Sequence, residues 1–329
     1  MLIGLNQNNE RVFAQHAKPH EIYKCPDCLS ELILKKGKHT VAHFAHRANS
    51  YCLRNSYKKE SLIHLASKHH IYSQLNDKVM IDMEYYLSEI DQIPDIIINK
   101  NIVVEFQYSP ISLDLLIDRT EGFKALNMRV IWIGKEIDYH NGVLRLSYFE
   151  AALINHIERT LITYNPHNKT LIRYEGIQPL DKYTFIGNRN KIEWEDLLKG
   201  HPVHHVPNLY LTDSAYHHYL SKCRQRRNVL EPTLSLLYNA GLIHKDRLQI
   251  IGIIVPEQIY FLTHCITWQT YLYYEMEKKT FTFENFFKFM KFRTFYDCHF
   301  SKKEILAKAL NSYISIIQQK SISRAKMTV

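Results

Sequence analysis

Two short segments rich in isoleucine and valine constrain the fold more than any other part of this chain. Residues 93–98 and 102–108 are β-branched runs, and the three residues between them, Asn-Lys-Asn at 99–101, have the composition of a tight turn. The pattern predicts an antiparallel hairpin in which Asp95 faces Glu105. Because the Cβ atoms of cross-strand partners lie about 4.5 to 5.5 Å apart, the two carboxylates can share one divalent cation.

The length of the turn decides whether these two acids meet. A two-residue loop would shift the pairing by one residue and put Asp95 and Glu105 on opposite faces of the sheet. Facing carboxylates in an apolar hairpin are destabilising unless a cation or a proton lies between them. The alternative to a metal site places Asp95 in solvent at the start of a strand and Glu105 at an exposed edge.

The segments around the hairpin have the periodicities of further helices and strands. Apolar residues recur near helical spacing in 57–75, and a second helix is predicted over 112–126. Apolar and polar residues mostly alternate in 79–85, which indicates a strand, and the segment 128–133 predicts another strand, ended by Gly134. The predicted order is helix, three strands, helix, strand, which is a compact α/β unit of the size of one domain.

A Cys-x-x-Cys spacing marks a second candidate site near the amino terminus. Cys25 and Cys28 have the spacing of a zinc knuckle. Three further ligand candidates follow within two dozen residues, namely His43, His46 and Cys52. We expect the three cysteines to bind one structural zinc ion, with His46 or His43 as the fourth ligand, and the metal to provide much of the folding free energy of so small a module. The alternative is free thiols beside histidines that are structural or face DNA.

The chain is basic, with a formal net charge of +9 and a sequence pI near 9.0. Such a balance favours polyanionic partners such as nucleic acid, although a charge that serves solubility alone is the alternative. Residues 1–59 contain ten Lys and Arg against four Asp and Glu, which directs the expected contact toward the amino-terminal module. Of the six cysteines, three lie in this proposed zinc module and three are scattered, at Cys223, Cys265 and Cys298, which fits a reducing compartment rather than a disulfide framework.

We expect a cytoplasmic protein, because no segment has the pattern of a signal peptide or a membrane span. Residues 1–5 are too short for the apolar region of a signal peptide and follow no basic residue. The apolar stretch 248–274 is interrupted by Pro256, Glu257 and His264, which predicts a buried helix pair or a helix and a strand.

The carboxy-terminal half predicts a hairpin followed by helices. The hairpin strands are 160–164 and 170–174, and the helix candidates are 192–198, 213–237 with a break, 258–274, 283–292 and 302–319. Aromatic and basic residues interleave in 281–300, a pattern that can stack bases while the cations follow phosphate. More often such residues form a helix core with a basic outer face, and we favour the core.

The motifs and their order resemble a known family. Pro94-Asp95 followed by Glu105-x-Gln107, in the order αβββαβ, resembles the PD-(D/E)XK nuclease superfamily in its E-x-Q variant. Across roughly residues 20–135 the motifs are similar to those of the competence protein CoiA family: CPDC at 25–28, HFAH at 43–46, Glu60-x-x-x-His64-x-x-x-Lys68, VEFQYSPIS at 104–112 and VIWI at 130–133.

The resemblance implies a restriction-endonuclease-like core that binds Mg²⁺ or Mn²⁺ and hydrolyses incoming or recombining DNA during natural transformation. It implies that Asp95 and Glu105 hold the metal and that Gln107 positions water or phosphate. Superfamily members often add an acid from the first helix, and Glu60 fits that position. Its partners would be single- or double-stranded DNA and recombination or DNA-uptake proteins.

Gln107 is a departure from the usual superfamily pattern, in which a lysine supplies a cation near the attacking water. An amide can only orient groups by hydrogen bonds. Either Lys68 or Arg119 can supply the missing charge from an adjacent helix. Lys68 shares one helix face with Glu60 and His64, at i, i+4 and i+8. The alternative for this helix face is an ordinary solvated polar series.

The resemblance divides the chain into three predicted domains. These are a zinc-knuckle-like β module at 1–56, a nuclease-like α/β domain at 57–150, and a mainly α-helical domain at 151–329 that begins with the hairpin. Two other functions fit the same pattern. One is a DNA-binding recombination adaptor on a nuclease fold with little or no catalysis, and the other is an endonuclease of defence or restriction type.

Overall fold

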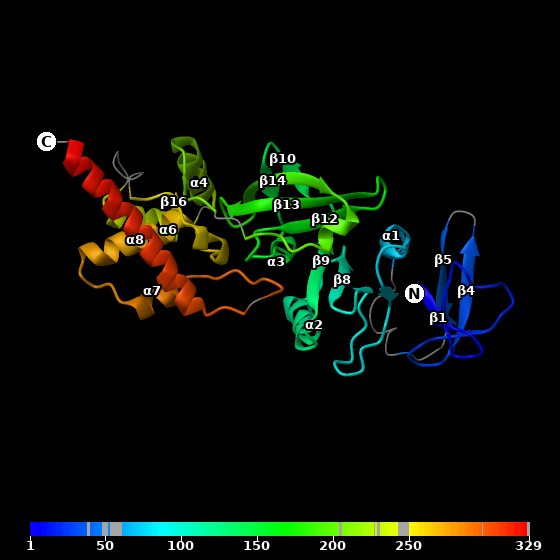
Figure 1. The fold of residues 1–329 in the computed structure, drawn as a ribbon. Coiled ribbons are helices and arrows are strands. Elements are labelled where there is room, and N and C mark those ends of the chain that lie inside the picture. Colours follow the sequence, from blue (N-terminus) through cyan, green and yellow to red (C-terminus); the bar gives the residue numbers. More distant parts are fainter. Residues whose placement is uncertain are drawn as a thin grey trace. The chain divides into compact units, whose positions relative to one another are not determined.

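The chain packs into two compact units (Figure 1). The computed structural model describes residues 1–37, 40–47, 52, 61–203, 206–226, 228, 231–242, 250–297 and 299–327. Unit 1 consists of Met1–Ile137, Leu161–Tyr174 and Arg189–His201, and unit 2 consists of Asp138–Thr160, Glu175–Asn188 and Pro202–Val329. The amino-terminal module and the predicted α/β region therefore pack in one unit together with two later segments, and the three-part division at residues 56 and 150 stays a prediction.

The amino-terminal module of unit 1 is a five-stranded antiparallel sheet. Its strands, in spatial order, are β2 (Arg11–Phe13), β1 (Ile3–Leu5), β3 (Tyr23–Lys24), β4 (Glu31–Gly37) and β5 (Thr40–His46). The rings of Tyr23 and Phe44 pack 5.0 Å apart at the centre of a small core. Gly4 lies against Phe44 so closely that an added Cβ would be 2.9 Å from the ring. The module therefore has a dense but small apolar interior.

The α/β part of unit 1 follows the predicted order of elements. It consists of α1 (Leu62–Leu75), β6 (Ile81–Met83), β7 (Ile96–Ile98), β8 (Ile102–Gln107), α2 (Leu113–Ala125) and β9 (Arg129–Gly134). Strand β6 is shorter than the predicted 79–85 because Glu84 adopts a left-handed φ of 50°, which ends the extended conformation. Membership of this unit in the restriction-endonuclease fold stays a proposal.

The predicted register of the hairpin is confirmed. Ile96 pairs with Val104 and Ile98 pairs with Ile102, so three residues form the turn. Asn99 and Lys100 have φ values of 50° and 63°, and asparagine tolerates this left-handed region better than most residues. Asp95 is the residue directly before β7, and its carboxylate accepts the backbone N–H of Phe106, the neighbour of Glu105, at 2.9 Å.

The two faces of this sheet are covered by different helices (Figure 1). Alternate residues such as Ile96, Val104 and Phe106 are buried in one core with Leu65 and Ile71 of α1. Because side chains alternate along a strand, Glu105 of β8 points to the other face. There α2 packs against β9, and the indole N–H of Trp132 donates to the Thr120 hydroxyl at 3.0 Å.

The predicted later hairpin is confirmed and extends the sheet of unit 1. It consists of β12 (Leu161–Asn165) and β13 (Thr170–Pro179), and β12 lies parallel to β9. The segment predicted as a helix at 192–198 is a single 3₁₀ turn, η2 (Trp194–Leu197), because Trp194 inserts beside the buried Tyr164 with ring centroids 5.1 Å apart. These later segments complete the core over α1.

Unit 2 contains short elements that the sequence pattern did not predict. They are β10 (Asp138–His140), β11 (Val143–Arg145), α3 (Tyr148–Ala152), β15 (Leu209–Tyr210), β16 (Ile253–Ile254) and β14 (Thr184–Ile192), whose last four residues belong to unit 1. Most have two to five residues, too few for an apolar period, and β14 has a polar, exposed second half. Their pairing depends on tertiary neighbours, as in the antiparallel contact of β11 with β14.

The helices of unit 2 follow the prediction more closely. They are α4 (Asp213–Gln225), α5 (Pro232–Asn239), η4 (Pro256–Tyr260), α6 (Cys265–Glu277), α7 (Phe283–Phe289) and α8 (Lys302–Met327). The stretch 281–300 forms a core, as favoured above: Phe286 and Phe295 are fully buried, and the buried Arg293 guanidinium lies 4.8 Å from the ring centre of Phe185. In the described part of the chain, no helix has the length and apolarity needed to cross a bilayer.

His264 lies between η4 and α6 and caps the start of α6. We expect this residue to make the stability of unit 2 depend on pH. His264 caps α6 by accepting the Ile266 N–H at 3.2 Å and stacks on Tyr219 with ring centroids 3.5 Å apart. Burial lowers the pKa of His264 to about 4. Since the unfolded chain binds the proton near pH 6.5, stability is fully present above that pH and is lost as the pH falls toward 4, by on the order of 3 kcal/mol.

Urea unfolding monitored at pH 7 and pH 4.5 measures this loss. A His264→Asn protein keeps an acceptor for the Ile266 N–H but does not titrate, so its stability should fall much less between the two pH values. Equal losses in both proteins would mean that other groups cause the acid sensitivity.

Candidate active site

Asp95 lies at the centre of the candidate site, held by groups from α1 and β8. One carboxylate oxygen accepts the Phe106 N–H at 2.9 Å and lies 2.7 Å from His64 Nε2, and the other lies 3.6 Å from Lys68 Nζ. Burial acts to raise the pKa of Asp95. The charges of His64 and Lys68 and the two hydrogen bonds outweigh burial, so the pKa lies below its usual range and the group is a carboxylate at neutral pH.

Helix α1 brings His64 and Lys68 to this acid. Ser61 starts the helix by accepting the His64 N–H at 3.2 Å, and the spacing of four residues puts both side chains on one face. The His64 ring packs edge-on against Phe106 and Tyr108, with ring centroids 6.1 Å from each. Glu60, the predicted acid on the same face, lies outside the described residues.

Glu84 is a site residue that the sequence reading missed. Lys68 is 2% exposed and donates to Glu84 at 2.5 Å, so the lysine links Glu84 to Asp95. The second carboxylate oxygen of Glu84 accepts the backbone N–H groups of Leu2 and Ile3, at 2.8 and 3.3 Å. In the sequence Glu84 is one polar residue of an alternating strand, and only its left-handed backbone turns it inward.

Glu105 is paired with a cation from the other helix. The Arg119 guanidinium of α2 donates to the Glu105 carboxylate at 2.6 Å and to the Ile93 carbonyl oxygen at 3.1 Å. Burial raises the pKa of Glu105 to about 7; Arg119 opposes this shift, and the nearby charge of Asp95 adds to it. The charge of Asp95 thus acts on Glu105, although the cationic partner of Asp95 lies on α1 and that of Glu105 lies on α2.

The carboxylates of the site lie beside cations from both helices. Glu84 and Asp95 lie beside Lys68 of α1, and Glu105 is paired with Arg119 of α2. His64 adds a positive charge beside Asp95 when its ring is protonated.

Gln107 follows Glu105 at two residues along the same strand and therefore on the same face. Its amide donates to the Ser109 carbonyl oxygen at 2.5 Å. The two cations considered as substitutes for the usual lysine are both present at the site, Lys68 beside Asp95 and Arg119 on Glu105. Lys68 Nζ lies 3.6 Å from a carboxylate oxygen of Asp95, the acid with the lowered pKa.

The cysteine motif of the amino-terminal module forms a separate cluster. The ligand atoms of Cys25, Cys28, His46 and Cys52 all lie within 4.8 Å of one another. Cys28 Sγ is 3.4 Å from His46 Nε2. The other histidine considered as a ligand, His43, has its Nδ1 2.9 Å from the Val41 carbonyl oxygen. Of the two histidines, His46 is thus the one that joins the cysteines.

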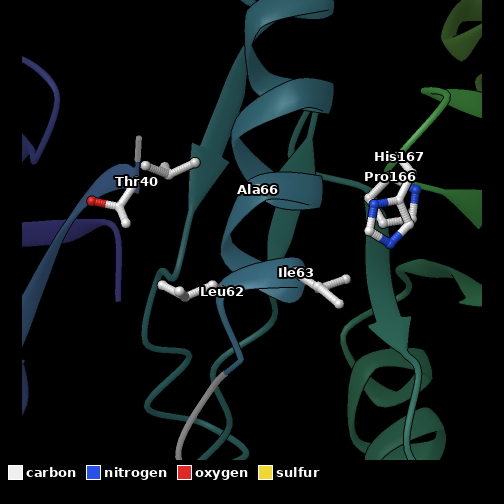
Figure 2. A pocket seen from close by; sticks show the side chains of 7 residues that line it. Thr40, Leu62, Ile63, Ala66, Pro166 and His167 are labelled. Atoms are coloured by element: carbon white, nitrogen blue, oxygen red, sulfur yellow. The ribbon is translucent and has the colours of Figure 1, made fainter. Parts of the chain in front are cut away.

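A hollow of about 240 Å³ lies beside the first turns of α1 (Figure 2). It is lined by Thr40, Val41, Leu62, Ile63, Ala66, Pro166 and His167. Figure 2 shows Leu62 and Ile63 projecting to opposite sides of the helix, Leu62 toward Thr40 and Ile63 toward the turn that carries His167. None of the acids of the candidate site lines this hollow.

Two family models match this chain. The model of the competence protein CoiA nuclease-like domain matches residues 60–201, which include all the acids and cations described above, and the model of the CoiA N-terminal domain matches residues 5–55. Competence protein CoiA of Bacillus subtilis (strain 168) is 32% identical over 186 residues, which are 54% of this chain and 48% of that protein. The match thus spans about half the length of this curated relative. No solved structure shows significant similarity. The matches to both domains, together with this relative, show that the chain belongs to the competence protein CoiA family.

Proposed function

We propose that the Asp95–Glu105 site hydrolyses phosphodiester bonds of DNA with the help of a divalent metal ion, Mg²⁺ or Mn²⁺. The observation that carries the proposal is the placement of Asp95, whose carboxylate accepts the N–H of Phe106, the neighbour of Glu105, and lies 3.6 Å from the buried cation of Lys68. The likeness to the nuclease-like domain of CoiA proteins supports it, and the net charge of +9 suits a polyanionic substrate. By the same likeness, the DNA would be incoming or recombining DNA.

The donor set fits a hard divalent cation. Carboxylate oxygens are preferred by Mg²⁺, which keeps several waters and needs only one or two protein carboxylates, here Asp95 and Glu105. Burial and the charge of Asp95 raise the pKa of Glu105 although Arg119 opposes this shift, and a bound cation would act in the same direction as Arg119. When bound, the metal would neutralise charge on the scissile phosphate and lower the pKa of the attacking water.

The other side chains have distinct roles in this proposal. Lys68, held by Glu84, places a positive charge beside Asp95. This charge would substitute for the usual lysine of the superfamily, whose position in this chain is taken by Gln107. Arg119 fixes the orientation of Glu105, and His64 fixes that of Asp95. Gln107 lies on the same strand face as Glu105 and can orient phosphate or water by hydrogen bonds. Glu60 remains the proposed additional acid.

One observation favours a second function, that of a DNA-binding recombination adaptor with little or no catalysis. Both acids already have cationic partners within the fold, Asp95 with Lys68 and Glu105 with Arg119, so the site holds together through internal ion pairs. In this function the same basic chain would bind single strands and pass them to recombination proteins.

Cleavage and binding measured on the same DNA separate the two functions. Purified protein is incubated with labelled single-stranded, duplex and branched DNA in Mg²⁺, Mn²⁺ or a chelator, and affinity is measured in parallel by fluorescence anisotropy. The nuclease proposal expects metal-dependent cleavage that falls at least about a hundredfold in a Glu105→Gln protein, while affinity for DNA stays within a few fold. DNA binding without any metal-dependent cleavage of any substrate would favour the adaptor.

A further inference from the structure

Three separate parts of the amino-terminal module converge on the cysteine cluster. Cys25 and Cys28 lie on the turn between β3 and β4, His46 is the last residue of β5, and Cys52 follows six residues later. Residue His46 is also paired across β4 with Leu32, so the sheet itself fixes the position of this ligand. The convergence therefore comes from the fold of the module and not from neighbouring positions in the sequence alone.

The distances suit tetrahedral coordination. With Zn–S bonds of about 2.3 Å and Zn–N bonds of about 2.0 Å, ligand atoms on a tetrahedron lie about 3.5 to 3.8 Å apart. Cys28 Sγ and His46 Nε2 are 3.4 Å apart, and no pair in the set exceeds 4.8 Å. Three sulfur ligands and one imidazole select zinc over magnesium or calcium, which prefer oxygen. Cys25, Cys28 and Cys52 carry no disulfide, so all three thiols can serve as ligands.

The core that surrounds the cysteine cluster is small. Its buried residues are Ala14, Ala17, Tyr23, Cys25, Leu32, Phe44 and Cys52. Two of these seven are the buried cysteines themselves, and only two are aromatic. Small domains with so few apolar residues commonly depend on a metal or on disulfides.

We propose that Cys25, Cys28, His46 and Cys52 bind one structural zinc ion that folds the amino-terminal module. This proposal does not rest on the nuclease activity. It does carry a consequence for that site, because Leu2, directly before β1, and Ile3, its first residue, supply the N–H groups that hold Glu84, the partner of Lys68. Loss of the ion would free β1 and with it one support of Lys68.

Metal content of the full chain tests the proposal. The protein, purified without chelators, should contain one zinc per chain by plasma mass spectrometry, and a Cys28→Ser protein should contain less than about a tenth of that. A matched Cys223→Ser protein, altered at a buried cysteine of unit 2, should keep the full equivalent. Replacement of zinc by Co²⁺ should give the thiolate charge-transfer and tetrahedral d–d bands of a sulfur-rich site.

A His46→Cys protein is the control for loss of zinc through misfolding, because it keeps four side chains that can bind zinc tetrahedrally. It should retain one zinc, whereas His46→Ala should lose it, and chelation of the wild type should lower the melting temperature by about 10 °C, restored by added zinc. Wild-type protein that neither contains zinc nor takes up Co²⁺, or a Cys28→Ser protein with a full equivalent, would overturn the proposal. An Asp95→Asn protein should keep its zinc, so failure of the nuclease proposal would leave this one standing.

Discussion

An Asp95→Asn protein is expected to lose metal-dependent DNA cleavage by about a thousandfold or more while it still folds and binds DNA. The amide oxygen of asparagine can still accept the Phe106 N–H, so the start of β7 keeps its anchor. The substitution removes the negative charge of the carboxylate, which a divalent cation needs as a ligand. A bound metal lowers the free energy of the transition state by several kcal/mol. The measurement is the single-turnover cleavage rate in Mg²⁺ and in Mn²⁺, with affinity for DNA measured on the same protein.

The control for this change is Asp118→Asn. Asp118 is an exposed acid of α2 next to Arg119 in the sequence, and its removal changes the net charge by the same amount. Its cleavage rate should stay within a factor of about two of the wild type, as for most exposed positions. Should Asp95→Asn cut DNA as fast as Asp118→Asn, the Asp95–Glu105 pair is not the reaction centre.

A Lys68→Met protein is expected to be less stable by about 3 to 5 kcal/mol. Lys68 is 2% exposed, and its removal leaves Glu84, itself 4% exposed, as a buried carboxylate without that cation. Breaking one side of a buried pair commonly costs this much, because the remaining charge is not compensated. The transition assigned to unit 1 in urea or heat should therefore shift, and that of unit 2 should not, since the two units need not unfold together.

The double change Lys68→Met with Glu84→Gln separates stability from catalysis. The glutamine oxygen can still accept the Leu2 and Ile3 N–H groups, so much of the lost stability should return. If Lys68 supplies the charge that Gln107 lacks, the double variant should still cut DNA at least about a hundredfold more slowly than the wild type, although its stability is restored. Wild-type cleavage by the double variant would reduce Lys68 to a structural role.

The hairpin and the order of elements around it could be predicted because their signals are local. Isoleucine and valine runs define β7 and β8, and the Asn-Lys-Asn turn fixes the pairing of Ile96 with Val104. Helical spacing likewise put Lys68 on the face of α1 that meets Asp95. In such segments each local preference agrees with the fold, so sequence reasoning succeeds.

Glu84 could not be predicted, because nothing local distinguishes it from a solvent-facing residue of a strand. Its inward position depends on a left-handed backbone and on N–H groups 82 and 81 residues away in the sequence. The early strands of unit 2, such as β10 and β11, could not be predicted for a related reason. With three residues each, they are defined by their partners and not by a period of their own.

The interleaving of the two units restricts how this protein can be divided or recombined. The chain passes from one unit to the other at residues 137, 160, 174, 188 and 201. A fragment ending at residue 150 would lack β12, leaving one side of β9 without its hydrogen-bonding neighbour, and would also lack Trp194 from the interior over α1. An unpaired strand side of this kind is a site for aggregation. Neither unit is therefore a continuous segment of the chain that could be moved into another protein as one piece.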